Sequence, residues 1–177
     1  MPSPSGSHIA RAVPSTPRPR ERPDVSLEAH LRPELYIPEL KARNKAAVLD
    51  EMVDALARAG VTRAPEAVRD ALRQREAVGS TGLGKGIAFP HARSTMVSER
   101  AIVVARSARG LDFESVDGEA VHIFFLIVAP PLERDEVYLQ LLARIVSAVR
   151  LARTRRRLLD ALDFEAIRSI LVRASDE

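Results

Sequence analysis

The stretch VHIFFLIVAP, residues 121–130, decides the fold class. Its residues are β-branched, aromatic or aliphatic almost without interruption, which is typical of a strand that is buried on both faces. The run AIVVARS, residues 101–107, has the same character. Between the two runs the segment RGLDFESVDGEA carries turn signals, the strongest at Asp117-Gly118. These patterns predict two central strands of a sheet that is covered on both sides.

Helical patterns precede and follow these strands. In residues 41–60 apolar residues fall at helical spacing, and Gly60 can end the helix; residues 64–77 predict a second helix with Pro65 at its first position. A third pattern begins at Asp135, and residues 154–174 supply one or two more helices. The order predicts a single α/β domain with a mixed β-sheet flanked by helices on both faces. The helical faces are Leu49, Met52, Val53 and Leu56; Val68, Ala71, Leu72 and Arg75; and Tyr138, Leu142, Ile145 and Val149.

The N-terminal part differs from the rest in composition. Residues 1–28 are rich in Pro, Ser and Arg without periodicity, and we expect a disordered tail whose arginines are solvated, with contact to an acidic partner as the alternative. Residues 29–177 form the domain. Its first ordered piece is predicted to be strand-like, at ELYIPEL, residues 34–40.

Bulk composition excludes several classes of function. The chain of 177 residues has no Cys, which excludes disulfides, thiolate metal sites and cysteine nucleophiles. Its net charge of +3, with 4% aromatic residues and no Trp, does not favour nucleic acid as a partner. The longest apolar run, residues 123–132, is too short for membrane insertion, and the N-terminus lacks a secretion signal, so a cytoplasmic location is expected. The four histidines show no spacing typical of a metal site.

Residues 79–93, GSTGLGKGIAFPHAR, place Gly79, Gly84 and Lys85 at the spacing of a nucleotide-binding phosphate loop. The preceding segment is a charged helix, Gly86 stands where Ser or Thr would hold Mg²⁺, and a short extended segment follows. We therefore expect no nucleotide cofactor. The four glycines predict a loop whose backbone N–H groups converge on an anion, or more simply a tight connection.

Among the histidines, His91 is the candidate functional residue. It follows Pro90 beside the glycine loop, with Arg93 next to it and Arg75 on the helix that leads into the loop. A neutral imidazole nitrogen is a competent nucleophile near pH 7. Amides and guanidinium groups can stabilise a phosphoryl group. His8 and His30 are predicted to lack a scaffold, and His122 to be a structural histidine.

The segment REAVGSTGLGKGIAFPHAR, residues 75–93, resembles the phosphorylation-site signature of type-2 enzyme IIA domains. These domains serve the fructose, mannitol and nitrogen-regulatory branches of the phosphoenolpyruvate-dependent phosphotransferase system. Glu76 matches the acidic position of the signature, and Phe89 stands where an aliphatic residue is usual. Residues 111–130 and 138–150 are similar to the family's next two blocks.

The resemblance implies that His91 accepts a phosphoryl group from an HPr-type phosphocarrier protein. The domain, a histidine phosphocarrier, then passes it to an enzyme IIB or holds it as a regulatory signal, without metal or other cofactor. The resemblance also implies that Arg75, Ser80 and Thr81 line the site, although Ser80 and Thr81 could equally be turn residues. Gly82 and Arg93 complete the predicted phosphate contacts, and Lys85 is expected to be solvated.

Two features depart from the family pattern or stand outside it. Family members usually carry a second histidine where this sequence has Tyr138, whose hydroxyl could donate to a phosphoryl oxygen or whose ring could simply pack. The run RLARTRRR, residues 150–157, is interpreted as a solvated helix surface, with a docking patch as the alternative.

Three functions follow: a carrier in sugar import, a module regulated through His91, or an interaction module that is never phosphorylated. The presence of His91 with Arg75 argues against the third. Because transport versions are often fused to IIB or membrane parts, which this sequence lacks, the second is slightly favoured over the first.

Overall fold

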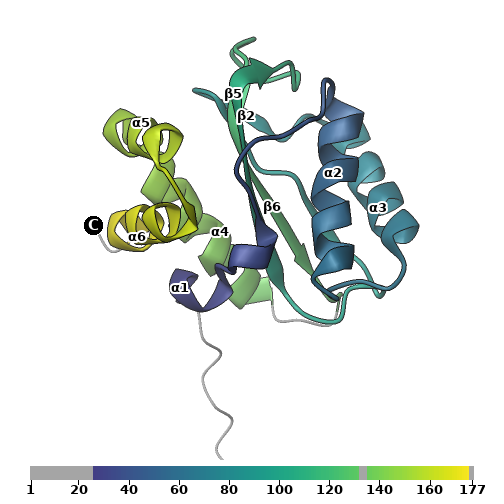
Figure 1. Ribbon diagram of the computed structural model, residues 1–177. Coiled ribbons are helices and arrows are strands. Elements are labelled where there is room, and N and C mark those ends of the chain that lie inside the picture. The colour runs from purple at the N-terminus through teal and green to yellow at the C-terminus, as the bar shows by residue number, and fades with distance from the viewer. Residues whose placement is uncertain (1–25, 132–134, 176–177) are drawn as a thin grey trace, which may run out of the picture.

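The computed structural model describes residues 26–131 and 135–175. Figure 1 shows a central sheet with helices on both sides. In chain order the elements are α1 (Leu27–His30), the 3₁₀ turn η1 (Pro33–Leu35), β1 (Tyr36–Ile37), α2 (Lys45–Arg58), α3 (Pro65–Val78), β2 (Gly82–Gly84), β3 (Ile87–Ala88), β4 (His91–Arg93), β5 (Ala101–Leu111), β6 (Val121–Ala129), α4 (Asp135–Val149), α5 (Ala152–Asp160) and α6 (Phe164–Ser175).

The sheet has six strands in the order β1-β5-β6-β3-β2, with β4 also paired to β6. The two long strands β5 and β6 are antiparallel, whereas β3 and β4 both run parallel to β6. Pro90, which has no N–H, separates β3 from β4, and its carbonyl accepts a hydrogen bond from Ile127 N at 3.0 Å. The sheet is therefore mixed, as the sequence predicted.

Successive residues of β6 enter two different hydrophobic cores. Phe124 and Leu126 belong to the core under α2 and α3, and Phe125 and Ile127 belong to the core under α1, α4 and α6; all four side chains are fully buried. Figure 1 shows the two groups of helices on opposite faces of the sheet. A strand with apolar residues on both faces needs this arrangement, and the predicted fold class is confirmed.

The end of α2 and the start of α3 lie where Gly60 and Pro65 predicted. Gly60 has a φ of +74° after α2, and the Gly60 and Val61 amides donate to the carbonyls of Ala57 and Leu56. This is a Schellman motif, which requires a left-handed residue at that position. Pro65 is the first residue of α3.

The boundary of the N-terminal tail is a correction. Residues 1–25 lie outside the described part of the chain, but Leu27 already begins α1 and is 2% exposed in the core beside α6. His30, predicted to have no scaffold, bonds the Ser26 carbonyl through Nδ1 and the Arg100 guanidinium through Nε2. A four-residue helix carries no periodic signal, so composition alone assigned these residues to the tail.

Of the two expectations for the glycine segment, the structure supports the tight connection, because most of the segment forms a β-hairpin. Strands β2 and β3 are antiparallel, and Lys85 and Gly86 turn between them with φ angles of +57° and +76°. Positive φ at two successive turn positions matches the right-handed twist of a hairpin, and it explains the glycine after Lys85. The side chain of Lys85 is exposed, as expected.

His122 has the structural role that the sequence predicted. Its Nδ1 lies 3.0 Å from the carbonyl oxygen of Ser107 on β5. The ring packs against Gly110, which has a φ of +72°. A Cβ added at Gly110 would lie 2.7 Å from Cε1 of the ring.

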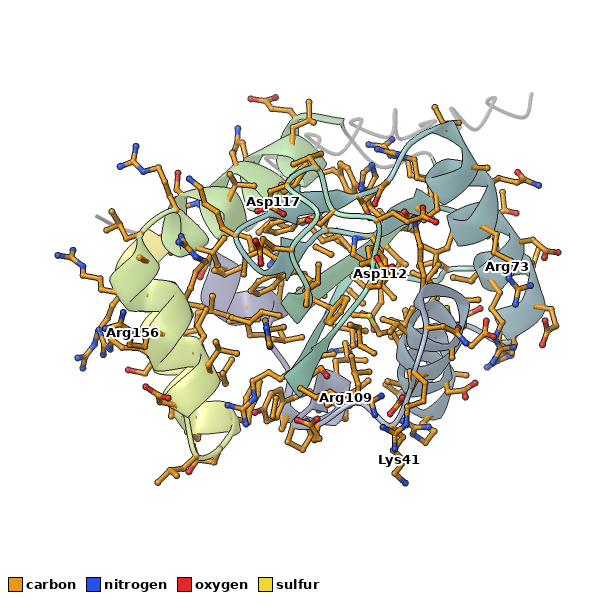
Figure 2. The ribbon with its side chains drawn as sticks, turned by 90° about the horizontal axis from the view of Figure 1, so that it is seen from above. Lys41, Arg73, Arg109, Asp112, Asp117 and Arg156 are labelled. Carbon is orange, nitrogen blue, oxygen red and sulfur yellow. The ribbon has the colours of Figure 1, made fainter. Side chains whose placement is uncertain are left out.

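The arginine-rich run lies mostly on α5. Arg156 and Arg157 are exposed, and Figure 2 shows Arg156 at the outer side of the molecule. Arg155 has a structural role, because its Nη1 donates to the carbonyls of Val149 and Arg150 at the end of α4. The interpretation as a solvated surface therefore fits the four exposed arginines, Arg150, Arg153, Arg156 and Arg157, but not Arg155.

Candidate functional site

Arg75 lies in the last turn of α3 and faces the sheet edge. Val68 and Leu72 of the same helix are fully buried, and Arg75 continues their side of the helix. Its Nη1 donates to the Gly79 carbonyl at 2.9 Å, just beyond the helix end, where a cation is favoured. Its Nε donates to His91 Nε2 at 3.0 Å. The end of α3 thus fixes the guanidinium against the imidazole.

The His91 ring is held through both of its nitrogens. His91 begins β4, and its Nδ1 lies 2.9 Å from the carbonyl oxygen of Phe89. A guanidinium can only donate, so Nε2 must be the accepting nitrogen, and Nδ1 must then carry the proton that is donated to Phe89. The contacts therefore place a nucleophilic lone pair on Nε2, next to a positive charge.

A pocket opens around this pair between α3, β4 and the start of α4. Its volume is about 420 Å³, and its lining residues are Ala71, Gln74, Arg75, His91, Ala92, Arg93 and Tyr138. Residues alternate in direction along a strand, so His91 and Arg93 share one side of β4. The sequence thus predicted four of the lining residues as site residues: His91, Arg75, Arg93 and Tyr138.

Tyr138 is a buried lining residue of the pocket. It is 6% exposed, its ring centroid lies 6.5 Å from that of His91, and the Arg93 guanidinium lies over the ring at 4.8 Å. Burial raises the pKa of Tyr138 to about 12, although the positive charges of Arg93 and Arg75 oppose the shift. The phenol is therefore neutral at physiological pH.

The other predicted phosphate contacts are engaged elsewhere. Ser80 Oγ donates to the Phe113 carbonyl at 2.7 Å, and the hydroxyl of buried Thr81 donates to Glu76 Oε1. Gly82 lies against Ser115, with its amide bonded to Ser80 Oγ. None of the three lines the pocket. Each would have to exchange its present contact to bind a phosphoryl group, and their role in phosphate binding stays a prediction.

The expectation that loop amides converge on an anion is wrong for this conformation. The amides of Gly79, Thr81, Gly82, Gly84 and Lys85 already donate to acceptors within the chain. Those acceptors are the Glu76 carbonyl, the Glu76 carboxylate, Ser80 Oγ, Ser115 Oγ and the Asp117 carboxylate. The positive character of the pocket comes from guanidinium groups instead.

Glu76 anchors the segment that leads from α3 to the hairpin. Its side chain is 6% exposed and pairs with Lys45 Nζ at 2.9 Å, in addition to the Thr81 hydroxyl and amide. Lys45 also pairs with the exposed Glu114 and lies over the Phe113 ring. The contacts with the two carboxylates outweigh the effect of burial and raise the pKa of Lys45. The acidic position of the signature therefore holds the backbone next to the site.

Sequence reasoning missed two residues near the site. Gln74 lines the pocket, and its place three positions after Ala71 on α3 could have indicated this, because residues at that spacing share a helix face. Lys45 contacts Glu76 across the chain, and no sequence signal connects them. Within residues 26–131 and 135–175 no three acidic or histidine side chains gather as they would around a metal ion. None of the helices in that part of the chain is long and apolar enough to cross a membrane.

Comparison with known families and relatives gives a consistent result. Residues 29–174 match the family model described as phosphoenolpyruvate-dependent sugar phosphotransferase system, EIIA 2. The chain is 36% identical over 132 residues to the PTS system fructose-specific EIIABC component of Bacillus subtilis, a match that covers 75% of the chain but only 21% of that protein. It is 36% identical over 140 residues to the nitrogen regulatory protein of Bradyrhizobium diazoefficiens, covering 78% of the chain and 90% of that protein.

Solved structures agree with the fold. The nitrogen regulatory protein IIA-Ntr from Neisseria meningitidis matches with a TM-score of 0.77 and 25% identity, over 82% of this chain and 98% of that one. Enzyme IIAMTL of Escherichia coli, solved in complex with phosphorylated enzyme IIBMTL, matches with a TM-score of 0.68 and 21% identity, over 80% of this chain and 96% of that one. The second similarity concerns the fold alone.

Proposed function

The chain belongs to the EIIA 2 family of the phosphoenolpyruvate-dependent sugar phosphotransferase system, and from this premise we propose that His91 accepts a phosphoryl group and carries it as a phosphohistidine. The observation that carries the proposal is the 3.0 Å hydrogen bond from Arg75 Nε to His91 Nε2. Together with the Nδ1 contact to Phe89, it leaves Nε2 as the nucleophilic nitrogen.

The transfer step exchanges one phosphorus–nitrogen bond for another. The Nε2 lone pair attacks phosphorus of a donor phosphohistidine, and the donor's P–N electron pair returns to the donor imidazole. His91 keeps its Nδ1 proton, so its ring becomes positively charged, while the donor ring loses the same charge. The Phe89 carbonyl, which accepts from Nδ1, stabilises the charged ring.

Arg75 and Arg93 supply the stabilisation that phosphoryl transfer depends on. Negative charge on the transferred oxygens is neutralised by fixed positive groups that are already in position. Arg75 gives up its bond to Nε2 when phosphorus approaches and donates to a phosphoryl oxygen instead. Its second bond, to the Gly79 carbonyl, keeps the guanidinium near the pocket during this exchange.

The proposed donor is an HPr-type phosphocarrier protein in the cytoplasm. The phosphoryl group is then passed to an enzyme IIB or retained as a signal that alters binding to a target protein. The relatives include both uses by name, a fructose-specific component and a nitrogen regulatory protein. The neutral phenol of Tyr138, which stands where a second histidine is usual, favours the regulatory use because it adds no charge to a rapid relay.

Incubation with phosphoenolpyruvate, enzyme I and HPr, followed by intact-mass measurement, tests the proposal. We expect the gain of one acid-labile phosphate in the wild-type chain and no gain in His91→Ala. An unmodified wild-type chain with a cognate HPr would contradict the proposal. The alternative, an interaction module that controls a partner without being phosphorylated, would then be supported.

A further inference from the structure

The pocket contains an arginine–tyrosine pair, Arg93 and Tyr138, of which the proposed transfer step uses only the arginine. Arg93 extends from β4 on the same side as His91, and its guanidinium carbon lies 4.8 Å from the centroid of the Tyr138 ring. A guanidinium over an aromatic face at this distance makes a cation–π contact, which is stronger where water is excluded. The ring of Tyr138 is almost completely buried. It therefore offers Arg93 a rigid surface.

The phenol cannot replace the charge of a histidine. A phenol is neutral at physiological pH even at its ordinary pKa of 10, and burial raises the pKa of Tyr138 further, to about 12. The same ring lies 6.5 Å from the His91 ring, so whatever rests on its face is held next to the phosphoryl acceptor. Among the described side chains, the charged group that lies over this ring is the Arg93 guanidinium.

We propose that Tyr138 is a positioning residue whose aromatic face, not its hydroxyl, holds the Arg93 guanidinium beside His91 for contact with the phosphoryl oxygens. This inference rests on the proposed function and deepens it. Arg75 reaches the pocket from α3, and Arg93 reaches it from β4, so the two cations are fixed by different elements. A phosphoryl group on His91 is then neutralised by two arginines.

The test measures binding of inorganic phosphate to the unphosphorylated domain, followed through the NMR signals of the arginine side chains and the His91 ring. Tyr138→Phe keeps the aromatic face, and we expect phosphate affinity within about twofold of wild type. Tyr138→Leu removes the face and is expected to weaken binding about fivefold to tenfold. The double variant Arg93→Ala/Tyr138→Leu should bind no more weakly than Arg93→Ala alone, because Tyr138 acts through Arg93.

Tyr36→Leu is the matched control. Tyr36 on β1 also lies beneath an arginine, with the Arg106 guanidinium 5.7 Å from its ring, but neither residue lines the pocket. Its loss should leave phosphate affinity unchanged. Should Tyr138→Leu fail to fold, the wild-type spectrum decides, because the Tyr138 ring must shift the Arg93 side-chain signals and Tyr138→Phe must preserve that shift.

Equal phosphate affinity of Tyr138→Leu and wild type would overturn the inference, and so would a phosphate affinity of Tyr138→Phe clearly below that of wild type. Additive losses of affinity in the double variant, Arg93 signals that the Tyr138 ring does not shift, or a wild-type pocket that binds no phosphate would overturn it as well. Phosphate binding requires no carrier protein. A chain that binds phosphate as described but is not phosphorylated by HPr would contradict the proposed function and leave the positioning role standing.

Discussion

Arg75 Nε lies 3.0 Å from His91 Nε2, and this contact joins the end of α3 to the edge strand β4. The same guanidinium bonds the Gly79 carbonyl, and the imidazole bonds the Phe89 carbonyl. Four groups from three segments thus hold the His91 ring with its lone pair on Nε2, the nitrogen that we propose as the phosphoryl acceptor. Such preorganisation is what an electrostatically stabilised transfer requires.

Arg75→Ala should slow the phosphorylation of His91 by HPr about 100-fold, because a fixed charge is lost where negative charge develops. The rate of phosphohistidine formation measures this. Arg73→Ala is the control: Arg73 lies on the same helix but pairs with Asp50 and Asp70 at the outer surface, as Figure 2 shows for its position. Equal rates for Arg75→Ala and wild type would contradict the assigned role.

Glu76→Ala should lower the free energy of unfolding by about 3 kcal/mol, because Lys45 loses its inner partner and the amide and hydroxyl of buried Thr81 lose their acceptor. Chemical denaturation measures this. Glu114→Ala is matched to it, since Glu114 pairs with the same lysine but is 74% exposed, and should cost less than about 1 kcal/mol. If the two variants were equally stable, Glu76 would not be the structural anchor.

Tyr138 should titrate near pH 12 in the folded protein. The chain has two tyrosines and no tryptophan, so the absorbance of Tyr36→Phe reports Tyr138 alone. Folding raises the pKa of Tyr138 above its unfolded value near 10, so the neutral phenol contributes to the stability of the folded state. That contribution is complete below pH 10 and is lost as the pH rises through about 12. A midpoint near 10 in the folded variant would show that the phenol is solvated.

Gly110→Ala should destabilise the protein by more than about 1 kcal/mol, because a left-handed φ of +72° disfavours a Cβ and the added atom would press on the His122 ring. Gly79→Ala is the comparison. Its φ of 164° is extended backbone, and no atom lies within 4 Å of the added Cβ, so thermal unfolding should be nearly unchanged. Equal melting temperatures for the two variants would contradict this prediction.

The sequence predicted the parts of the fold that depend on local patterns. The apolar run in residues 121–130 predicted a doubly covered strand, and Gly60 and Pro65 marked helix ends that the structure confirms. The signature around His91 predicted that His91 and Arg75 share a site. They do lie together, because the segment between them is short and is fixed by Glu76.

The parts that failed depend on contacts between distant residues. The amides of Gly84 and Lys85 bond Ser115 and Asp117, about 30 residues further along, which no local pattern reveals. The two backbone bonds to Asp117, from Lys85 and Glu119, lower the pKa of that carboxyl, and the bond from Lys85 holds the hairpin turn. The stacking of Arg93 on Tyr138 likewise joins β4 to α4 and appears only in three dimensions.

The central claim is that Nε2 of His91 receives the phosphoryl group. Nitrogen NMR of the imidazole, recorded before and after phosphorylation by HPr, measures it most directly. We expect a protonated Nδ1 and an unprotonated Nε2 at first, and then coupling of phosphorus to Nε2 with the Nδ1 proton retained. Phosphorus on Nδ1, on another residue, or absent after treatment with a cognate carrier would contradict the account.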